Sequence, residues 1–146
     1  MTLNIGAVTL FGNCHKHRLE EHEKAILKKD STFIFAHHKF FYDNDVYYST
    51  TYKRAEQSND TIVLLKDQTV GQIVLIFTDD GVVSMLVKIM IVEAINKFPA
   101  HIQKIRRSLT DEFVAVRADE VLEKMLLIST TNESYVSRLP NHYEGD

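Results

Sequence analysis

The pattern of apolar and polar residues along the chain indicates a succession of short β-strands. Its clearest part runs from Thr61 to Val92, where three stretches rich in Val, Ile, Leu and Phe are separated by two short polar segments. The separators are Asp67-Gln68 and Asp79-Asp80-Gly81, and Asp and Gly tolerate the backbone angles that tight hairpin turns require. We therefore predict three consecutive antiparallel strands, with Gly71 as a bulge or bend that curls the sheet.

Short strands are also predicted on both sides of this region. Aromatic and aliphatic residues alternate at 32–42, and a turn at 43–45 leads into the β-branched and aromatic stretch 46–52, which together indicate a hairpin. The weak alternation within 1–13 permits one further strand. Three more strands are expected nearer the C-terminus, at 112–118, 124–130 and 134–140.

The remaining segments favour helix or irregular structure. Helix formers dominate residues 18–29, with Glu in the first turn and Lys in the last, and indicate a short surface helix. Residues 82–95 are apolar at nearly every position, so periodicity does not separate a buried strand from a buried helix, and their β-branched content favours the strand. Helical turns are expected at 93–98 and 118–122, and the basic connector 101–107 is assigned no firm structure.

These elements define the predicted fold class, which is mainly β (a β-rich α+β fold). Many short strands joined by turns favour a small bent-sheet barrel with one N-terminal helix and short peripheral helical turns. A parallel α/β fold would need longer helices between the strands. We expect one domain, 1–146, with an N-terminal extension at 1–30 and a barrel-like core at 31–146, as part of a longer protein. An apolar strand such as Met85 to Val92 at a sheet edge would favour homodimerisation.

Composition narrows the function classes. The chain has 17 Lys and Arg against 20 Asp and Glu and a formal charge of −3, which argues against a surface devoted to phosphate backbones. Its one cysteine, Cys14, excludes an intramolecular disulfide and fits a reducing compartment. No charge-free apolar run reaches the length of about 18 residues expected of a membrane span. We expect a nuclear protein, with the cytoplasm as the alternative.

Two stretches resemble a domain found in animal proteins that are encoded by, or derived from, CACTA-type DNA transposons. They are Tyr47 to Ile76 and Tyr135 to Asp146. The shared elements are Tyr47-x-Ser49-x-x-Tyr52, the Lys53-Arg54 pair, Asp67 to Gly71, and Arg138-Leu139-Pro140-Asn141. Residues 63–81 and 111–128 are also similar to a divergent bromo-adjacent homology (BAH) domain, a barrel module of chromatin proteins.

The resemblance implies a BAH-like, non-catalytic interaction module with a chromatin-associated protein partner. BAH domains that read methyl-lysine use an aromatic cage, commonly with a Trp after the strand that corresponds to Val82 to Val92. Here that strand carries Met85, Val87, Ile89 and Met90, and the chain has no Trp. The sequence thus departs from the pattern of methyl-lysine readers.

The histidines do not predict a metal site. Cys14, His15, His17 and His22 lie close together in the sequence, but their spacing matches no finger or ribbon pattern of zinc ligands. His37 and His38 fall on opposite faces of their predicted strand, so at most one faces the core, where we expect a satisfied structural histidine. No metal and no cofactor are expected.

Catalytic groups are not recognisable either. The acidic pairs Asp43/Asp45 and Asp79/Asp80 lie in predicted turns, where Asp is favoured because its side chain caps the local backbone. No Ser or Cys stands at a spacing typical of a nucleophile. We therefore expect that the protein is not an enzyme.

Aromatic and basic residues are the candidates for partner binding. Aromatic residues are densest at 40–52, where alternate members of the hairpin point to opposite faces and one face is core. Basic residues cluster at 53–54 and 104–107. The predicted partner-binding residues are Phe41, Tyr48, Tyr52, Lys53, Arg54, Lys104, Arg106 and Arg107. A protein partner is the first hypothesis, and the alternative is a nucleic acid bound by the basic loops and the aromatic hairpin.

Overall fold

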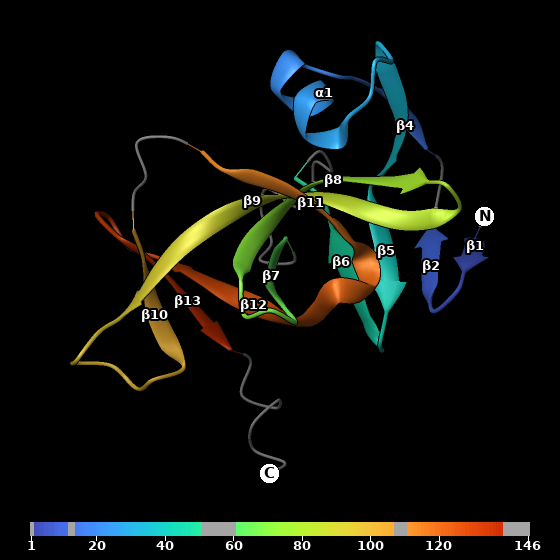
Figure 1. The fold of residues 1–146 in the computed structure, drawn as a ribbon. Helices are drawn as coiled ribbons and strands as arrows, with labels where there is room; N and C mark the ends of the chain where they lie inside the picture. The colour runs from blue at the N-terminus through green and yellow to red at the C-terminus, as the bar shows by residue number, and fades with distance from the viewer. Residues whose placement is uncertain (1, 12–13, 51–60, 107–110, 139–146) are drawn as a thin grey trace.

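The computed structural model describes residues 2–11, 14–50, 61–106 and 111–138. Thirteen strands, one α-helix and one short 3-10 helix form within these ranges (Figure 1). The strands are β1 (Thr2–Ile5), β2 (Val8–Phe11), β3 (His15–Arg18), β4 (Phe33–His37), β5 (Lys39–Tyr42), β6 (Asp45–Tyr48), β7 (Ile62–Leu65), β8 (Val70–Asp79), β9 (Val82–Ala94), β10 (Ile102–Arg106), β11 (Phe113–Arg117), β12 (Val121–Ser129) and β13 (Ser134–Arg138). The helices are α1 (Glu21–Leu27) and the 3-10 helix η2 (Ala118–Glu120).

The strands form two antiparallel sheets, which confirms the mainly β fold class. The smaller sheet has the order β1-β2-β5-β6, and the larger has the order β11-β9-β10-β13-β12-β7-β8-β4-β3. An additional pairing of β9 with β8 closes six strands of the larger sheet into a ring, β8-β9-β10-β13-β12-β7. Strands β3, β4 and β11 are not members of this ring, so the larger sheet is only partly closed (Figure 1).

A shared hydrophobic core joins the two sheets. Side chains alternate between the faces of each strand, and one face of the smaller sheet points at the ring. This core contains Val8, Leu10, Phe40 and Tyr47 from the smaller sheet and Val63, Leu65, Ile73, Ile76, Val83, Met85 and Val87 from the ring. Residues 1–30 and the later part of the chain therefore contribute to the same sheets, since β2 pairs with β5 and β3 with β4.

The predicted strand 32–42 is two strands in two different sheets. The chain bends at His38, so β4 pairs with β8 in the larger sheet while β5 pairs with β6 in the smaller one. The single strand expected within 1–13 is likewise a hairpin, in which Gly6 adopts a φ of +61° between β1 and β2. The β5–β6 hairpin itself was predicted correctly.

Helix α1 is shorter than the predicted helix 18–29. Leu19 lies directly after β3 and continues the hydrogen-bond pattern of β3 with β4, because its N–H donates to the carbonyl of Thr32. A capping box between Glu20 and Glu23 then begins the helix, and Lys28, in the left-handed conformation, ends it. Ile26 and Leu27 pack against a buried cluster formed by Ala36, Leu75, Phe77 and Leu86. No helix in the described ranges is both long enough and apolar enough to span a membrane.

Strand β9 settles three predictions. Residues 82–94 are a strand, as their β-branched content indicates. This strand is not an edge, because β8 pairs with it on one side and β11 and β10 pair with it on the other. Met85 to Val92 is therefore not a free edge through which a second copy could pair. The irregularity between β8 and β9 lies between Ile73 and Leu75, so the bulge predicted at Gly71 is also misplaced.

The C-terminal elements follow the prediction with one addition. Strands β11, β12 and β13 lie within a few residues of the expected positions, and η2 replaces the helical turn expected at 118–122. The helical turn expected at 93–98 is not present: Glu93 and Ala94 still belong to β9, and a tight turn follows in which the N–H of Phe98 donates to the carbonyl of Ile95. The basic connector 101–107 contains an additional strand, β10.

Candidate functional site

The predicted partner-binding residues do not form one site. Lys104 and Arg106 lie on β10 in the ring, whereas Phe41 and Tyr48 lie on β5 and β6 in the smaller sheet. Figure 1 shows β10 and β5 at opposite sides of the molecule. The other four predicted residues, Tyr52, Lys53, Arg54 and Arg107, fall outside the described residues.

Lys104 and Arg106 lie at one end of the ring, where two hairpins meet. Two surface cavities of about 600 and 550 Å³ lie there, and both are lined by Glu93, Lys104 and Glu133. Strand pairing creates this arrangement, because Lys104 stands opposite Glu93 of β9 on one side and opposite Tyr135 of β13 on the other. We call this region the hairpin-end surface, and its residues are Glu93, Phe98, Lys104, Arg106, Glu133 and Tyr135.

Opposite charges are paired across the hairpin-end surface. Lys104 Nζ lies 2.8 Å from Glu133 Oε1, and Arg106 Nε lies 3.8 Å from Glu93 Oε2. The hydrogen bond from Lys104 lowers the pKa of Glu133, and the same bond raises the pKa of Lys104. Tyr135 also donates its hydroxyl proton to Glu133, which raises the pKa of Tyr135. Both charged groups of the Lys104–Glu133 pair therefore remain ionised near neutral pH.

An aromatic pair adjoins these charges. The rings of Phe98 and Tyr135 meet edge to face, with centroids 5.5 Å apart. Phe98 is 43% exposed at the β9–β10 connection, and both residues line the second cavity. These two residues were not predicted as site residues, because neither lies in the aromatic-rich stretch 40–52. Their contact depends on the pairing of β10 with β13, which local sequence does not reveal.

The aromatic hairpin divides its side chains between two faces, as predicted. Phe40 and Tyr47 are buried and stacked, with centroids 5.2 Å apart, and burial is the main reason that the pKa of Tyr47 is raised far above its usual value. Phe41 lies on the opposite face, edge to face with Phe11 at 6.5 Å. Lys39 Nζ lies 5.5 Å from the ring of Phe11 and 5.7 Å from that of Tyr48. Phe41 and Tyr48 are only half-buried, so this outer aromatic face is accessible.

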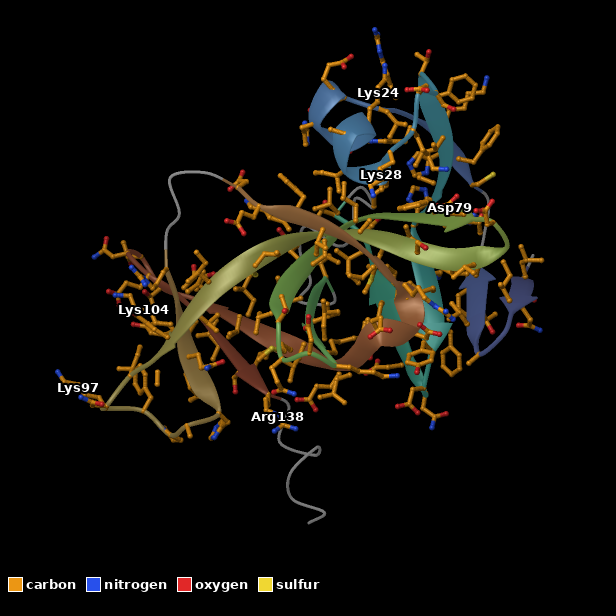
Figure 2. The ribbon with its side chains drawn as sticks, viewed as in Figure 1. Lys24, Lys28, Asp79, Lys97, Lys104 and Arg138 are labelled. Carbon is orange, nitrogen blue, oxygen red and sulfur yellow. The ribbon has the colours of Figure 1, made fainter. Side chains whose placement is uncertain are left out.

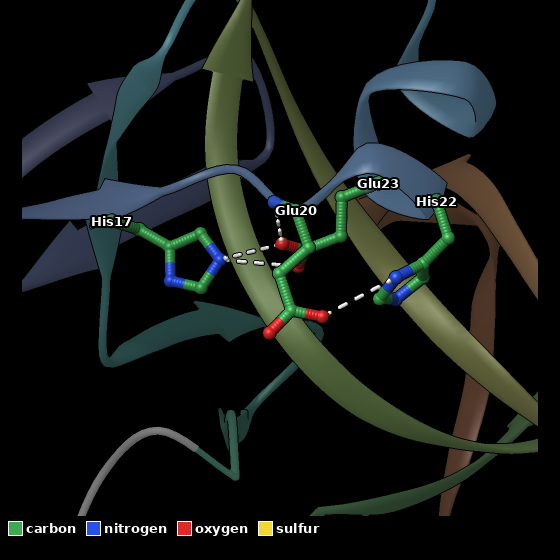
Figure 3. Close-up of polar contacts among 4 residues, drawn as sticks. All are labelled: His17, Glu20, His22 and Glu23. Carbon is green, nitrogen blue, oxygen red and sulfur yellow. Dashed lines mark hydrogen bonds and ion pairs between the residues drawn. The ribbon is translucent and has the colours of Figure 1, made fainter.

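Histidines gather where the chain passes between the two sheets. The rings of His15 and His38 stack with centroids 4.5 Å apart, and the Nδ1 atoms of His15 and His37 are buried without a hydrogen-bond partner, unlike the satisfied histidine expected here. Burial, followed by repulsion from His38, lowers the pKa of both His15 and His37. His17 Nε2 lies 3.1 Å from a carboxylate oxygen of Glu23 (Figure 3). The described residues contain no group of three or more side chains arranged to hold a metal ion.

This cluster predicts that the fold loses stability as the pH falls from about 7 to 5. His15 and His37 have a lower pKa in the folded protein, so the unfolded chain takes up protons first as the pH drops through the ordinary value of 6.5. The contribution of the two histidines to folding stability is complete above pH 6.5 and is lost as the pH falls below it. Urea unfolding across this range should show a falling midpoint, and NMR titration should place both imidazoles below 6.5. A constant midpoint, with both histidines titrating at their ordinary value, would contradict this expectation.

The acidic pairs lie only in part in the predicted turns, because Asp45 begins β6 and Asp79 ends β8. Asp43 and Asp80 adopt left-handed backbone conformations within tight turns, each with a φ of 51°. Asp45 accepts a hydrogen bond from the N–H of Val46. Asp79 Oδ1 lies 3.0 Å from Lys29 Nζ, which connects the end of β8 to the segment after α1.

Comparisons with protein families, with curated protein sequences and with solved structures found no match to this chain. The fold and its surfaces define the class: a mainly β protein in which one sheet is partly closed into a ring. The end of that ring carries paired charges beside an aromatic pair.

Proposed function

We propose that the chain is a non-catalytic interaction module that binds a protein partner through the hairpin-end surface. One observation carries the proposal: the edge-to-face pair of Phe98 and Tyr135 adjoins two cavities whose shared lining contains both signs of charge. An aromatic anchor beside satisfied polar groups is typical of protein interfaces. The aromatic pair supplies contact area, and the charged pairs orient the partner.

The charges at this surface favour a protein over a nucleic acid. Nucleic-acid affinity comes mainly from cations that neutralise phosphates. Lys104 and Arg106 each lie beside a glutamate, so an approaching phosphate would meet Glu133 and Glu93 at the same place. A protein segment that carries both signs of charge avoids this repulsion and can exchange ion pairs with all four residues.

The type of assembly in which the partner would be found is inferred from the sequence resemblance alone. A BAH-like module of a chromatin or transposon-related assembly in the nucleus stays a prediction. Residues 47–76 and 135–146 resemble the transposon-derived domain, and residues 63–81 and 111–128 resemble a BAH domain. Methyl-lysine recognition is not part of the proposal, since the chain contains no Trp.

Affinity purification with a matched pair of variants tests the proposal. Phe98→Ala should reduce partner recovery from nuclease-treated nuclear extract by about tenfold, because truncation of an interface anchor costs more than about 1 kcal/mol. Leu122→Ala is the control, since Leu122 is 42% exposed, against 43% for Phe98, and lies on β12 away from the surface. Equal recovery by the two variants would overturn the assignment of the surface. A partner set that disappears after nuclease treatment would favour the nucleic-acid hypothesis.

A further inference from the structure

The β3–β4 ribbon presents an open sheet edge. β3 is the last strand of the larger sheet, and among the described strands it pairs only with β4. β4 in turn pairs with β8 only through Ala36 and His37. The outer half of this ribbon therefore extends beyond the ring, on the same side of the molecule as α1 (Figure 1). An unpaired strand edge is a template for the addition of another strand.

The ladder of the ribbon shows which backbone groups lie at this edge. In an antiparallel pair, hydrogen-bonded and non-hydrogen-bonded residue pairs alternate. The N–H of Leu19 donates to the carbonyl of Thr32, so His17 and His15, two and four residues earlier, also direct their backbone groups at β4. Lys16 and Arg18 therefore direct their N–H and carbonyl groups outward. Within the described part of the chain, the outer edge of β3 therefore has two free N–H donors and two free carbonyl acceptors, spaced as in an antiparallel ladder.

The side chains of Lys16 and Arg18 supply positive charge at the same edge. Both are exposed, and no acidic residue of the described ranges forms an ion pair with either one. They share a face of the ribbon with the residues directly opposite, Phe35 and Phe33, which are 53% and 42% exposed. Lys16 Nζ lies 4.7 Å from the centre of the Phe33 ring, a distance at which the ammonium group and the ring attract each other.

We propose that the open edge of β3 binds an extended acidic peptide segment by strand addition. The peptide residues opposite Lys16 and Arg18 are two positions apart and project their side chains to the face that carries these cations. Carboxylates at alternate positions of the peptide therefore meet Lys16 and Arg18, while the peptide backbone pairs with theirs. This surface is separate from the hairpin-end surface and adds a second binding function to the one proposed above.

The geometry favours a peptide over the other candidate occupants. The rings of Phe33 and Phe35 stand at 86° to each other, and Lys16 covers one face of Phe33, so they do not offer the parallel open platform on which successive bases stack. A second copy of the chain would place Lys16 and Arg18 opposite their own counterparts, where like charges destabilise the pairing. An acidic strand has neither disadvantage.

A fluorescence anisotropy titration of the full chain tests the proposal. The probe is a labelled peptide of about ten residues with alternating Glu and Thr, long enough to cover the edge of β3. It should bind saturably, whereas the same peptide with Lys in place of Glu should not bind. N-methylation of the Glu residues keeps the charge but removes the backbone donors, and this change should weaken binding by at least about tenfold.

Matched charge reversals identify the surface. Arg18→Glu should weaken binding of the acidic peptide by about tenfold. Lys28→Glu makes the same change in charge at an exposed residue that ends α1, and it should leave binding nearly unchanged. Equal effects of the two variants, equal binding of the N-methylated peptide, or no saturation below about 1 mM would each overturn the proposal. Tighter binding of labelled oligothymidylate that Arg18→Glu abolishes would assign the edge to single-stranded nucleic acid instead. None of these results depends on Phe98, so they are independent of the test of the hairpin-end surface.

Discussion

Phe40→Ala is expected to lower the free energy of unfolding by about 3–5 kcal/mol, the usual cost of removing a large buried aromatic side chain. Phe40 is 0% exposed and stacks on Tyr47 at the point where the smaller sheet packs against the ring. Its loss leaves a cavity between the two sheets that neighbouring side chains fill only in part. Urea denaturation followed by far-ultraviolet circular dichroism measures the change.

Phe41→Ala is the matched control for this prediction. Phe41 is the next residue of β5 and points to the opposite face, where it is half-buried beside Phe11. Its truncation should therefore cost less than half as much as that of Phe40. Equal losses for the two variants would mean that the hairpin does not place one aromatic residue in the core and the next on the surface.

Local sequence predicts the turns and the strands that flank them. Gln68, Asp80 and Gly81 adopt positive φ angles, as expected of Asp- and Gly-rich hairpin connections. The strands β7, β8 and β9 follow from their β-branched and aliphatic residues, since burial on both faces gives continuous apolar runs. These features depend on interactions between near neighbours, which a single sequence reveals.

Two strands escaped prediction because their side chains are mostly polar. β3 has the sequence His-Lys-His-Arg, and it becomes a strand through its ladder with β4 and through the contact of His17 with Glu23. β10 follows a proline and contains Lys104 and Arg106. It becomes a strand because it pairs with β9 on one side and with β13 on the other. Tertiary pairing outweighs local propensity in both strands.

The candidate surfaces were only partly predictable for the same reason. Lys104 and Arg106 are noticeable as a basic cluster, but the neighbouring glutamates that change its character are Glu93, eleven positions before Lys104, and Glu133, far along the chain. The paired charges appear only when the ring closes. Figure 2 shows only where this surface lies: Lys97 and Lys104 are at one end of the molecule, well away from Lys24 and Lys28 beside α1.

Gly71→Ala is expected to destabilise the fold by about 2–3 kcal/mol, through overpacking. Gly71 pairs with Val63 on one side and with Ile89 on the other, so its backbone is held within the ring. A Cβ added there would lie 2.2 Å from Val87 Cγ1 and 3.1 Å from the carbonyl oxygen of Lys88. Val87 is itself 0% exposed, so its side chain has little room to move away. The close approach of Val87, and not a bulge, explains why a residue without a side chain occupies position 71.

A double-mutant cycle with Val87→Ala separates this cause from a general loss of packing. Val87→Ala removes the methyl group that meets the new Cβ, so the double variant should be more stable than the sum of the two single effects predicts, by about 1–2 kcal/mol. Gly81→Ala is a second control, because nothing lies within 4 Å of its added Cβ and only its φ of +76° is unfavourable. It should cost about 1 kcal/mol. Additive effects of Gly71→Ala and Val87→Ala would show that the two side chains do not compete for the same space. The 2.2 Å approach of the added Cβ to Val87 Cγ1 would then not be the cause of the destabilisation.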